Sequence, residues 1–178
     1  MHQSFSIACG LLLSLQLATA ADKGPPPAQA QRGRELFTKS PKGTACGQCH
    51  SMAGLGRAVG PDLTTLASTV GPKGLTMTFK MTVYAYVKDY NLAQEVFPGI
   101  EKRRLIDDLE IWDLSQHPPA LRKLAAKQIL SARQTRTWKH PPASAGYTPQ
   151  EFADLIGFLK WAATGATTEI KPSDIEGQ

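Results

Sequence analysis

The sequence is poor in the residues that build most catalytic and metal sites. Its 178 residues include only three cysteines and four histidines. It has no phosphate-binding G-x-x-x-x-G-K-[ST] sequence and no pair of histidines at the spacing of one helical turn. No stripe of basic and aromatic residues indicates nucleic-acid binding. We therefore expect no catalytic residues, no enzyme activity and no nucleic-acid partner.

Long apolar runs are also scarce. The most apolar stretch, Phe5 to Leu17, is interrupted by small and polar residues, and a membrane-spanning helix needs roughly 20 apolar residues. The stretch leads into Ala18-Thr19-Ala20, small residues in the order that signal peptidase accepts. Residues 1–20 are therefore predicted to be a signal peptide, although they contain no Lys or Arg. The mature protein is predicted to be exported to the periplasm without a transmembrane helix.

The charge of the chain lies entirely outside this signal. Residues 1–20 contain no Lys, Arg, Asp or Glu, so the formal net charge of +5 belongs to the mature protein. Its length of about 160 residues suits one domain with a single core. A positive charge can steer encounters with acidic protein partners. Lys and Arg are scattered along this chain, however, as on an ordinary solvated surface.

The cysteines that remain after export form one motif. Cys9 leaves with the signal, whereas Cys46 and Cys49 stand immediately before His50 in a C-x-x-C-H sequence. At this spacing two thiols can bond to the two vinyl groups of one haem while the adjacent imidazole faces the iron. The motif predicts one covalent haem c on Cys46 and Cys49, with His50 as an axial ligand.

The same cysteines could serve in two other kinds of site. C-G-x-C is also a thiol-disulfide exchange pattern, and His50 could lower a thiol pKa; but residues 38–45 form a turn with Pro and Gly, without the apolar strand that precedes such a site. Structural zinc requires four ligands. The mature chain has no second C-x-x-C and no H-x₃₋₅-H pair to complete them.

The two ends of the mature chain are the easiest parts to interpret. Residues 21–31 contain three consecutive prolines and are predicted to be a flexible leader. A short helix is expected over residues 31–37. A second helix is predicted to begin after Thr148, an N-cap followed by proline, and to stop at Gly165. Residues 166–178 are expected to be a frayed polar tail.

The middle of the chain gives weaker signals. Residues 79–88 alternate between apolar and polar side chains, as in a half-buried strand, although a helix is not excluded. Residues 101–114 and 120–136 carry apolar side chains at helical spacing and are predicted to be two helices. Ile111, Trp112 and Leu114 are candidates for a contact with another protein.

Two blocks of the sequence resemble the class I, or mitochondrial-type, cytochromes c in their single-haem bacterial version. The first block is Gly33-x-x-x-Phe37, Cys46-Gly47-Gln48-Cys49-His50 and Gly60-Pro61-Asp62-Leu63, and the second is Thr148 to Trp161. The resemblance implies a mainly all-α fold around one haem over residues 32–165. The segment at about 71–136 would be an insertion that contains extra helices and a possible small β-hairpin.

The resemblance also implies how the terminal helices pack. In that family the first and last helices cross near the haem edge. Gly33 would permit their close approach, and Phe37 would pack on Phe158 or Trp161.

The family pattern further suggests the groups around the iron. The carbonyl of Pro61 would accept the proton of the His50 nitrogen that faces away from the metal. The family usually supplies a methionine as sixth ligand, from a loop before the closing helix. This chain has His140 followed by two prolines there, and no methionine after Met81. His140 is therefore the expected sixth ligand, with Met81 and Met77 as alternatives.

Three functions follow from these expectations. The first is an electron carrier that cycles between Fe(III) and Fe(II), with a dehydrogenase, an oxidase or a reaction centre as redox partner. The second is a haem-containing subunit of a larger redox complex. The third is a gas-binding or sensing protein with an open or displaceable distal site, which carbon monoxide binding would separate from the first.

Overall fold

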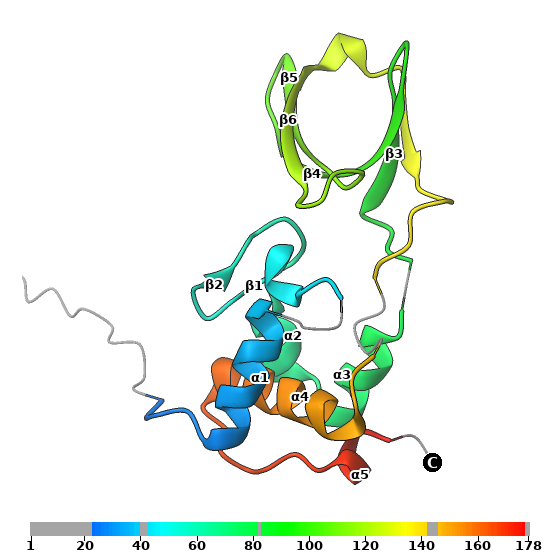
Figure 1. Cartoon of the computed structure of the whole chain (residues 1–178). Coiled ribbons are helices and arrows are strands. Elements are labelled where there is room, and N and C mark those ends of the chain that lie inside the picture. Colours follow the sequence, from blue (N-terminus) through cyan, green and yellow to red (C-terminus); the bar gives the residue numbers. More distant parts are fainter. Residues whose placement is uncertain (1–22, 40–42, 82, 142–145, 177–178) are drawn as a thin grey trace, which may run out of the picture.

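The computed structural model describes residues 23–39, 43–81, 83–141 and 146–176 (Figure 1). The predicted signal peptide therefore lies outside the described residues. The helices are α1 (Ala28–Lys39), η1 (Cys46–Gln48), α2 (Leu63–Thr69), α3 (Pro72–Phe79), η2 (Ala126–Gln128), α4 (Pro149–Thr164) and α5 (Pro172–Ile175). The strands are β1 (Ser51–Met52), β2 (Leu55–Gly56), β3 (Val87–Asn91), β4 (Val96–Arg104), β5 (Asp108–Asp113), β6 (Ala120–Ala125) and β7 (Ser131–Gln134).

Helices α1 and α4 cross at Gly33, as expected. A Cβ atom built on Gly33 would lie 2.0 Å from the carbonyl oxygen of Asp154, so only glycine allows this approach. One turn further along, the rings of Phe37 and Phe158 lie 5.4 Å apart between their centroids. The predicted packing of the first helix on the last is therefore confirmed, and it forms the centre of the main core.

An ion pair reinforces the same crossing. The Arg32 guanidinium donates to both carboxylate oxygens of Asp154, at 2.6 and 3.0 Å. Burial raises the pKa of Asp154, but hydrogen bonds from Arg32, Gln150 and Gln29 outweigh it and lower the pKa below the ordinary value. The carboxylate therefore stays ionised and joins the two helices.

The closing helix begins and ends where its sequence predicts. The Thr148 hydroxyl accepts from the Glu151 amide, and the Glu151 carboxylate accepts from the Thr148 amide, which completes a capping box. Gly165 ends the helix in the left-handed conformation, with φ of 75°.

Both chain ends are more ordered than expected. Helix α1 begins at Ala28, three residues before the predicted start. The Gln29 side chain exchanges two hydrogen bonds with the backbone of Ile170, at 2.7 and 2.8 Å. Ile170 and Ile175 are buried against the main core. The segment after Gly165 therefore packs on the helices, where the sequence suggested a frayed end.

The inserted segment corrects the expected fold class. It forms a five-stranded antiparallel sheet in the order β6-β5-β4-β3-β7, so the fold is not mainly all-α but combines a helical body with a sheet. Figure 1 shows the strands of this sheet curving round, and one buried apolar cluster lies within the sheet. The side chains that fill it are Tyr90, Phe97, Leu109, Ile111 and Leu124.

The two helices predicted in the insertion are strands. Residues 101–114 contain the second half of β4 and the whole of β5, and residues 120–136 contain β6, η2 and β7. Burial along β5 alternates from one residue to the next, with the period of a strand. Ile106, which a helical stripe would bury, is 98% exposed in the β4–β5 turn. The predicted strand at 79–88 is also misplaced, because α3 ends at Phe79 and β3 begins at Val87.

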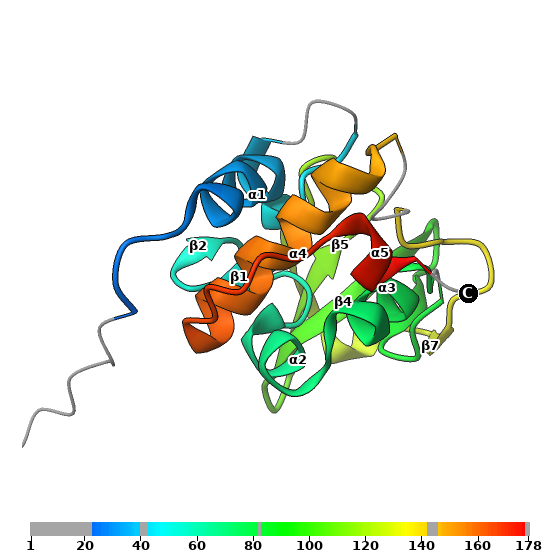
Figure 2. The same cartoon turned by 90° about the horizontal axis from the view of Figure 1, so that it is seen from below.

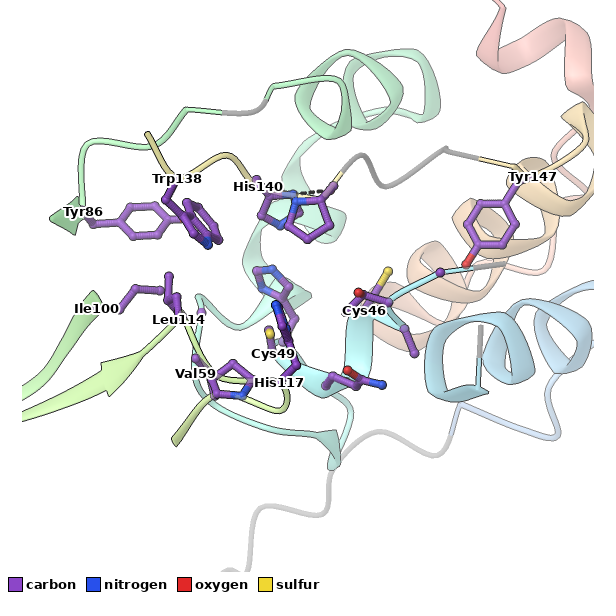
Figure 3. A pocket seen from close by; sticks show the side chains of 18 residues that line it. Cys46, Cys49, Val59, Tyr86, Ile100, Leu114, His117, Trp138, His140 and Tyr147 are labelled. Atoms are coloured by element: carbon purple, nitrogen blue, oxygen red, sulfur yellow. Dashed lines mark hydrogen bonds between the residues drawn. The ribbon is translucent and has the colours of Figure 1, made fainter. Parts of the chain in front are cut away.

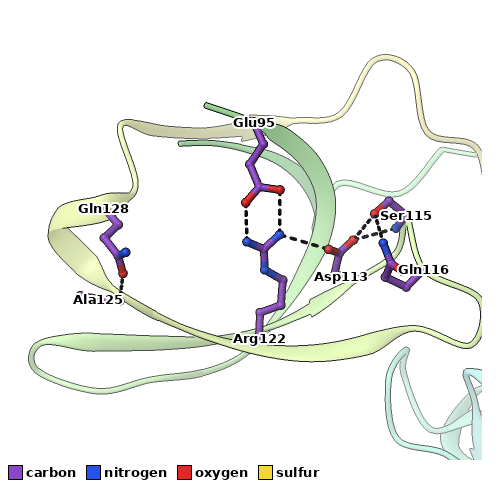
Figure 4. A network of polar contacts seen from close by, with 7 residues as sticks. All are labelled: Glu95, Asp113, Ser115, Gln116, Arg122, Ala125 and Gln128. Atoms are coloured by element: carbon purple, nitrogen blue, oxygen red, sulfur yellow. Dashed lines mark hydrogen bonds and ion pairs between the residues drawn. The ribbon is translucent and has the colours of Figure 1, made fainter. Parts of the chain in front are cut away.

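A polar network ties the sheet together (Figure 4). The Arg122 guanidinium on β6 pairs with Asp113 on β5 at 3.2 Å and with Glu95, next to β4, at 2.5 Å. It also lies over the Phe97 ring, 4.3 Å from its centroid. Ser115 donates its amide and hydroxyl to Asp113. A carboxylate that is only 3% exposed is thus fully partnered.

The sheet and the helices occupy opposite ends of the molecule (Figure 1), so the strands lie behind the helices when the molecule is seen from below (Figure 2). Among the described residues, the extensive contacts between elements lie within the helical body or within the sheet, and the turn η1 belongs to the helical body. A small cluster around Val59, Val87 and Leu114 joins the two parts. No helix in the described part of the chain is long and apolar enough to cross a membrane.

Candidate haem site

The C-x-x-C-H motif forms one tight helical turn. The amides of Cys49 and His50 both donate to the carbonyl of Cys46, at 3.1 and 2.8 Å. The chain then returns, and the amides of Val59 and Gly60 donate to the carbonyl of Cys49 at 3.0 and 2.8 Å. These bonds fix the backbone so that the two thiols and the imidazole all line one cavity.

Pro61 orients the His50 ring in the way that the family resemblance implies. The distance between His50 Nδ1 and the Pro61 carbonyl oxygen is 2.7 Å. A carbonyl only accepts, so Nδ1 carries the proton and Nε2 keeps its lone pair. Burial lowers the pKa of His50 despite this hydrogen bond, which favours the neutral imidazole that binds metals. Gly60 allows the contact, because a Cβ atom there would lie 2.8 Å from His50 Cε1.

The structure places the ring of His140 next to the ring of His50. The ring centroids lie 5.8 Å apart, and the ring planes make an angle of 47°. His140 Nδ1 lies 2.6 Å from the carbonyl oxygen of Pro141, so its Nε2 also keeps a lone pair. Burial, and then the neighbouring His50, lower the pKa of His140. Both rings are thus held as neutral bases with the same nitrogen free.

This separation fits a metal between the two rings. A metal bound about 2 Å from one nitrogen of each imidazole keeps the ring centres about 6 Å apart. Two imidazoles could bind the iron of a haem, two thiols in the adjacent turn could attach it covalently, and the apolar side chains around them suit its ring. The residues present therefore fit that group.

Two cavities meet at this pair of histidines. The larger measures about 300 Å³ and the smaller about 250 Å³. Both are lined by Cys46, His50, Tyr86 and His140. Figure 3 shows the larger one, with the turn of the cysteines on one side and Trp138 and His140 on the other. The space beside the two rings is thus large enough and apolar enough for a sizeable ligand.

The comparison with protein families agrees with this chemistry. The model of the family described as Cytochrome c matches residues 30–117. Residues 30–117 therefore contain a cytochrome c domain. A comparison with curated proteins found no similar sequence. The match includes α1, the C-x-x-C-H turn and most of the inserted sheet, whereas His140 and α4 lie beyond it. The cytochrome c domain makes this chain a haem-binding electron-transfer protein.

The thiols of this cytochrome are unsuited to disulfide exchange. Cys46 and Cys49 form no disulfide with each other. Burial raises the pKa of Cys46 to about 11 and also raises that of Cys49. An exchange site needs a thiol whose pKa is lowered, because the thiolate is the nucleophile. The buried thiols therefore lack the lowered pKa that exchange chemistry requires.

The alternative methionines lie away from the cavities of the cytochrome. Met77 and Met81 are 66% and 51% exposed, and neither lines the two cavities around His50. His140 is the residue, among the three candidates, that the structure brings to His50.

The sequence did not indicate which residues of the inserted sheet would line the site. Ile100, Leu114 and His117 line the larger cavity from the sheet. Ile111 and Leu114, suggested as contacts with another protein, are buried and therefore do not serve that role. Trp138, two positions before His140 in the sequence, also lines this cavity. It is the one sequence feature that could have indicated an aromatic lining near His140.

Proposed function

We propose that this cytochrome is an exported, single-haem electron carrier in which His50 and His140 both bind the iron. The observation that carries the proposal is the pair of neutral imidazoles, 5.8 Å apart, with each Nδ1 held by a proline carbonyl. Removal of residues 1–20 on export would place the protein in the periplasm, where haem is attached to cysteines after translocation. Cys46 and Cys49 would hold one haem covalently.

The residues of the chain would hold and tune the bound group. Haem supplies a one-electron Fe(III)/Fe(II) couple when it is bound. The Pro61 and Pro141 carbonyls fix the tautomer of each histidine and raise its basicity toward the metal. The apolar side chains of Ile100 and Leu114 would exclude water from one side of the larger cavity. Two histidine ligands favour a lower reduction potential than the histidine and methionine of many relatives.

Two strong ligands also favour electron transfer over the binding of a substrate to the iron. With His50 and His140 both bound, no coordination position is open to a substrate. We therefore propose transient contact with a redox protein, such as a dehydrogenase, an oxidase or a reaction centre. The positive net charge of the chain suits an acidic partner.

The test is the absorption spectrum of the purified protein, made with haem-attachment machinery, beside that of His140→Met. The wild type should show sharp reduced α and β bands and lack the far-red ferric band that a methionine ligand gives. The variant should gain that band, and its reduction potential should rise. A far-red band in the wild type would refute the role of His140, and a protein without haem bands would refute the whole proposal.

A further inference from the structure

His140 lies on one of the two segments that connect the sheet to the helical body. Residues 80–86 lead from α3 into β3, and residues 135–148 lead from β7 to α4. Because the sheet and the helices make few other contacts, these connections decide where the ring of His140 lies.

Each connection contributes an aromatic side chain against His140. The Tyr84 ring lies 5.4 Å from the His140 ring, at 68°. The Trp138 ring lies 6.2 Å away, at 89°. Both contacts are edge-to-face, an arrangement that favours one ring orientation over others. We call Tyr84 and Trp138 the aromatic clamp.

The aromatic clamp is attached to the first residue of the sheet. The Val87 amide donates to the Tyr84 carbonyl at 3.2 Å, and the Val87 carbonyl accepts from the Thr135 amide at 3.1 Å. The Trp138 amide in turn donates to the Thr135 hydroxyl at 3.2 Å. Val87 and Thr135 are 0% and 4% exposed, so water does not compete for these bonds. A displacement of β3 would therefore move both members of the clamp.

We propose that the inserted sheet holds the sixth ligand in place, with Tyr84 and Trp138 as positioning residues that clamp the ring of His140. This inference rests on the proposed function, in which His140 binds the iron. Without the clamp, His140 leaves the metal more often, and a diatomic ligand enters the position that it vacates. The insertion thus controls access to the distal side of the haem.

The rate of carbon monoxide binding to the reduced holoprotein measures how often His140 leaves the metal. In the wild type, the observed rate should reach a plateau at high carbon monoxide, set by the loss of His140. Trp138→Leu and Tyr84→Leu should each raise the plateau at least tenfold. Trp161→Leu is the matched control, because Trp161 is a half-buried indole on α4 that lines neither cavity. Its plateau should equal that of the wild type.

A second readout separates positioning from loss of stability. The electron paramagnetic resonance signal of the ferric protein depends on the angle between the two imidazole planes. Trp138→Leu should shift this signal, whereas Trp161→Leu should not. Thr135→Val keeps the shape of the side chain but removes the hydroxyl that accepts from Trp138. Thr135→Val should shift the signal in the same direction as Trp138→Leu. If Trp138→Leu does not fold, Thr135→Val and Tyr84→Leu test the clamp in its place.

The outcomes distinguish the two proposals. A wild-type plateau that is unchanged in the folded clamp variants would overturn the clamp and leave His140 as the ligand. A wild-type rate that rises without limit, with a spectrum unchanged by His140→Met, would overturn the proposed function itself.

Discussion

Replacement of Gly33 by alanine tests the packing on which the helical body depends. The new Cβ atom would lie 2.0 Å from the Asp154 carbonyl oxygen and 2.7 Å from Phe158 Cβ. Ordinary contacts of this kind are about 3.5 Å or longer. Helices α1 and α4 would therefore have to separate by more than 1 Å, because the first of these neighbours is rigid backbone.

The expected magnitude follows from two opposing effects. Overpacking of this kind costs about 3 kcal/mol when backbone must move, and the higher helix propensity of alanine returns about 1 kcal/mol. The net loss should be about 2 kcal/mol, or roughly 6 °C in the midpoint of thermal unfolding for a chain of this size. The control is Gly71→Ala, because no atom lies within 4 Å of the new Cβ at that position. It should cost about 0.5 kcal/mol, because Gly71 is the N-cap of α3 and alanine is a poorer N-cap than glycine.

The assay is thermal unfolding of the holoprotein followed by circular dichroism. The absorption spectrum of Gly33→Ala should stay that of the wild type, since the crossing contributes no residue to either cavity around His50. If Gly33→Ala were as stable as Gly71→Ala, the close approach of the two helices would be refuted.

Three further predictions concern single interactions. Arg122→Met leaves the buried Asp113 carboxylate without its cation, so we expect a loss of about 2 kcal/mol, measured by urea unfolding; an unchanged midpoint would contradict the role of the network. Thr148→Ala removes the N-cap of α4 and should cost about 1 kcal/mol, whereas Thr148→Ser should retain most of the stability. The pKa of Asp154 is lowered in the folded protein, so its contribution is complete above its unfolded pKa of about 4 and is lost as the pH falls. Stability between pH 5 and pH 2, both taken as approximate limits, should fall less in Asp154→Asn than in the wild type; equal slopes would show that another carboxyl group is responsible.

The sequence predicted the parts of the fold whose signals are local. The N-cap at Thr148 and the stop at Gly165 are decided by neighbouring residues, and both appear in the structure. The turn of Cys46 to His50 is equally local, because its hydrogen bonds span a few residues. The close approach at Gly33 came from the family resemblance rather than from the residues alone.

The sheet was missed because its signals are not local. The alternation along β5 covers only six residues, and the apolar residues Leu105 and Ile106 in the preceding turn extend the pattern into one that a helical stripe would also show. The meeting of His140 with His50 has the same origin. The two residues are far apart in the chain, and the whole sheet lies between them. Only the resemblance indicated which loop would approach the ring.

The pairing of the first and last strands of the insertion has a consequence for chain entropy. Lys88 lies opposite Gln134, so the sheet begins and ends at the same place. The cost of closing a flexible loop grows with its length, by about 0.6 kcal/mol for each doubling. A folded sheet replaces almost fifty residues of flexible chain with a single short span between neighbouring strands. The helical body therefore joins α3 to α4 through the two connections at 80–86 and 135–148 alone, and a large insertion separates the two ligand-bearing segments at a reduced entropic cost.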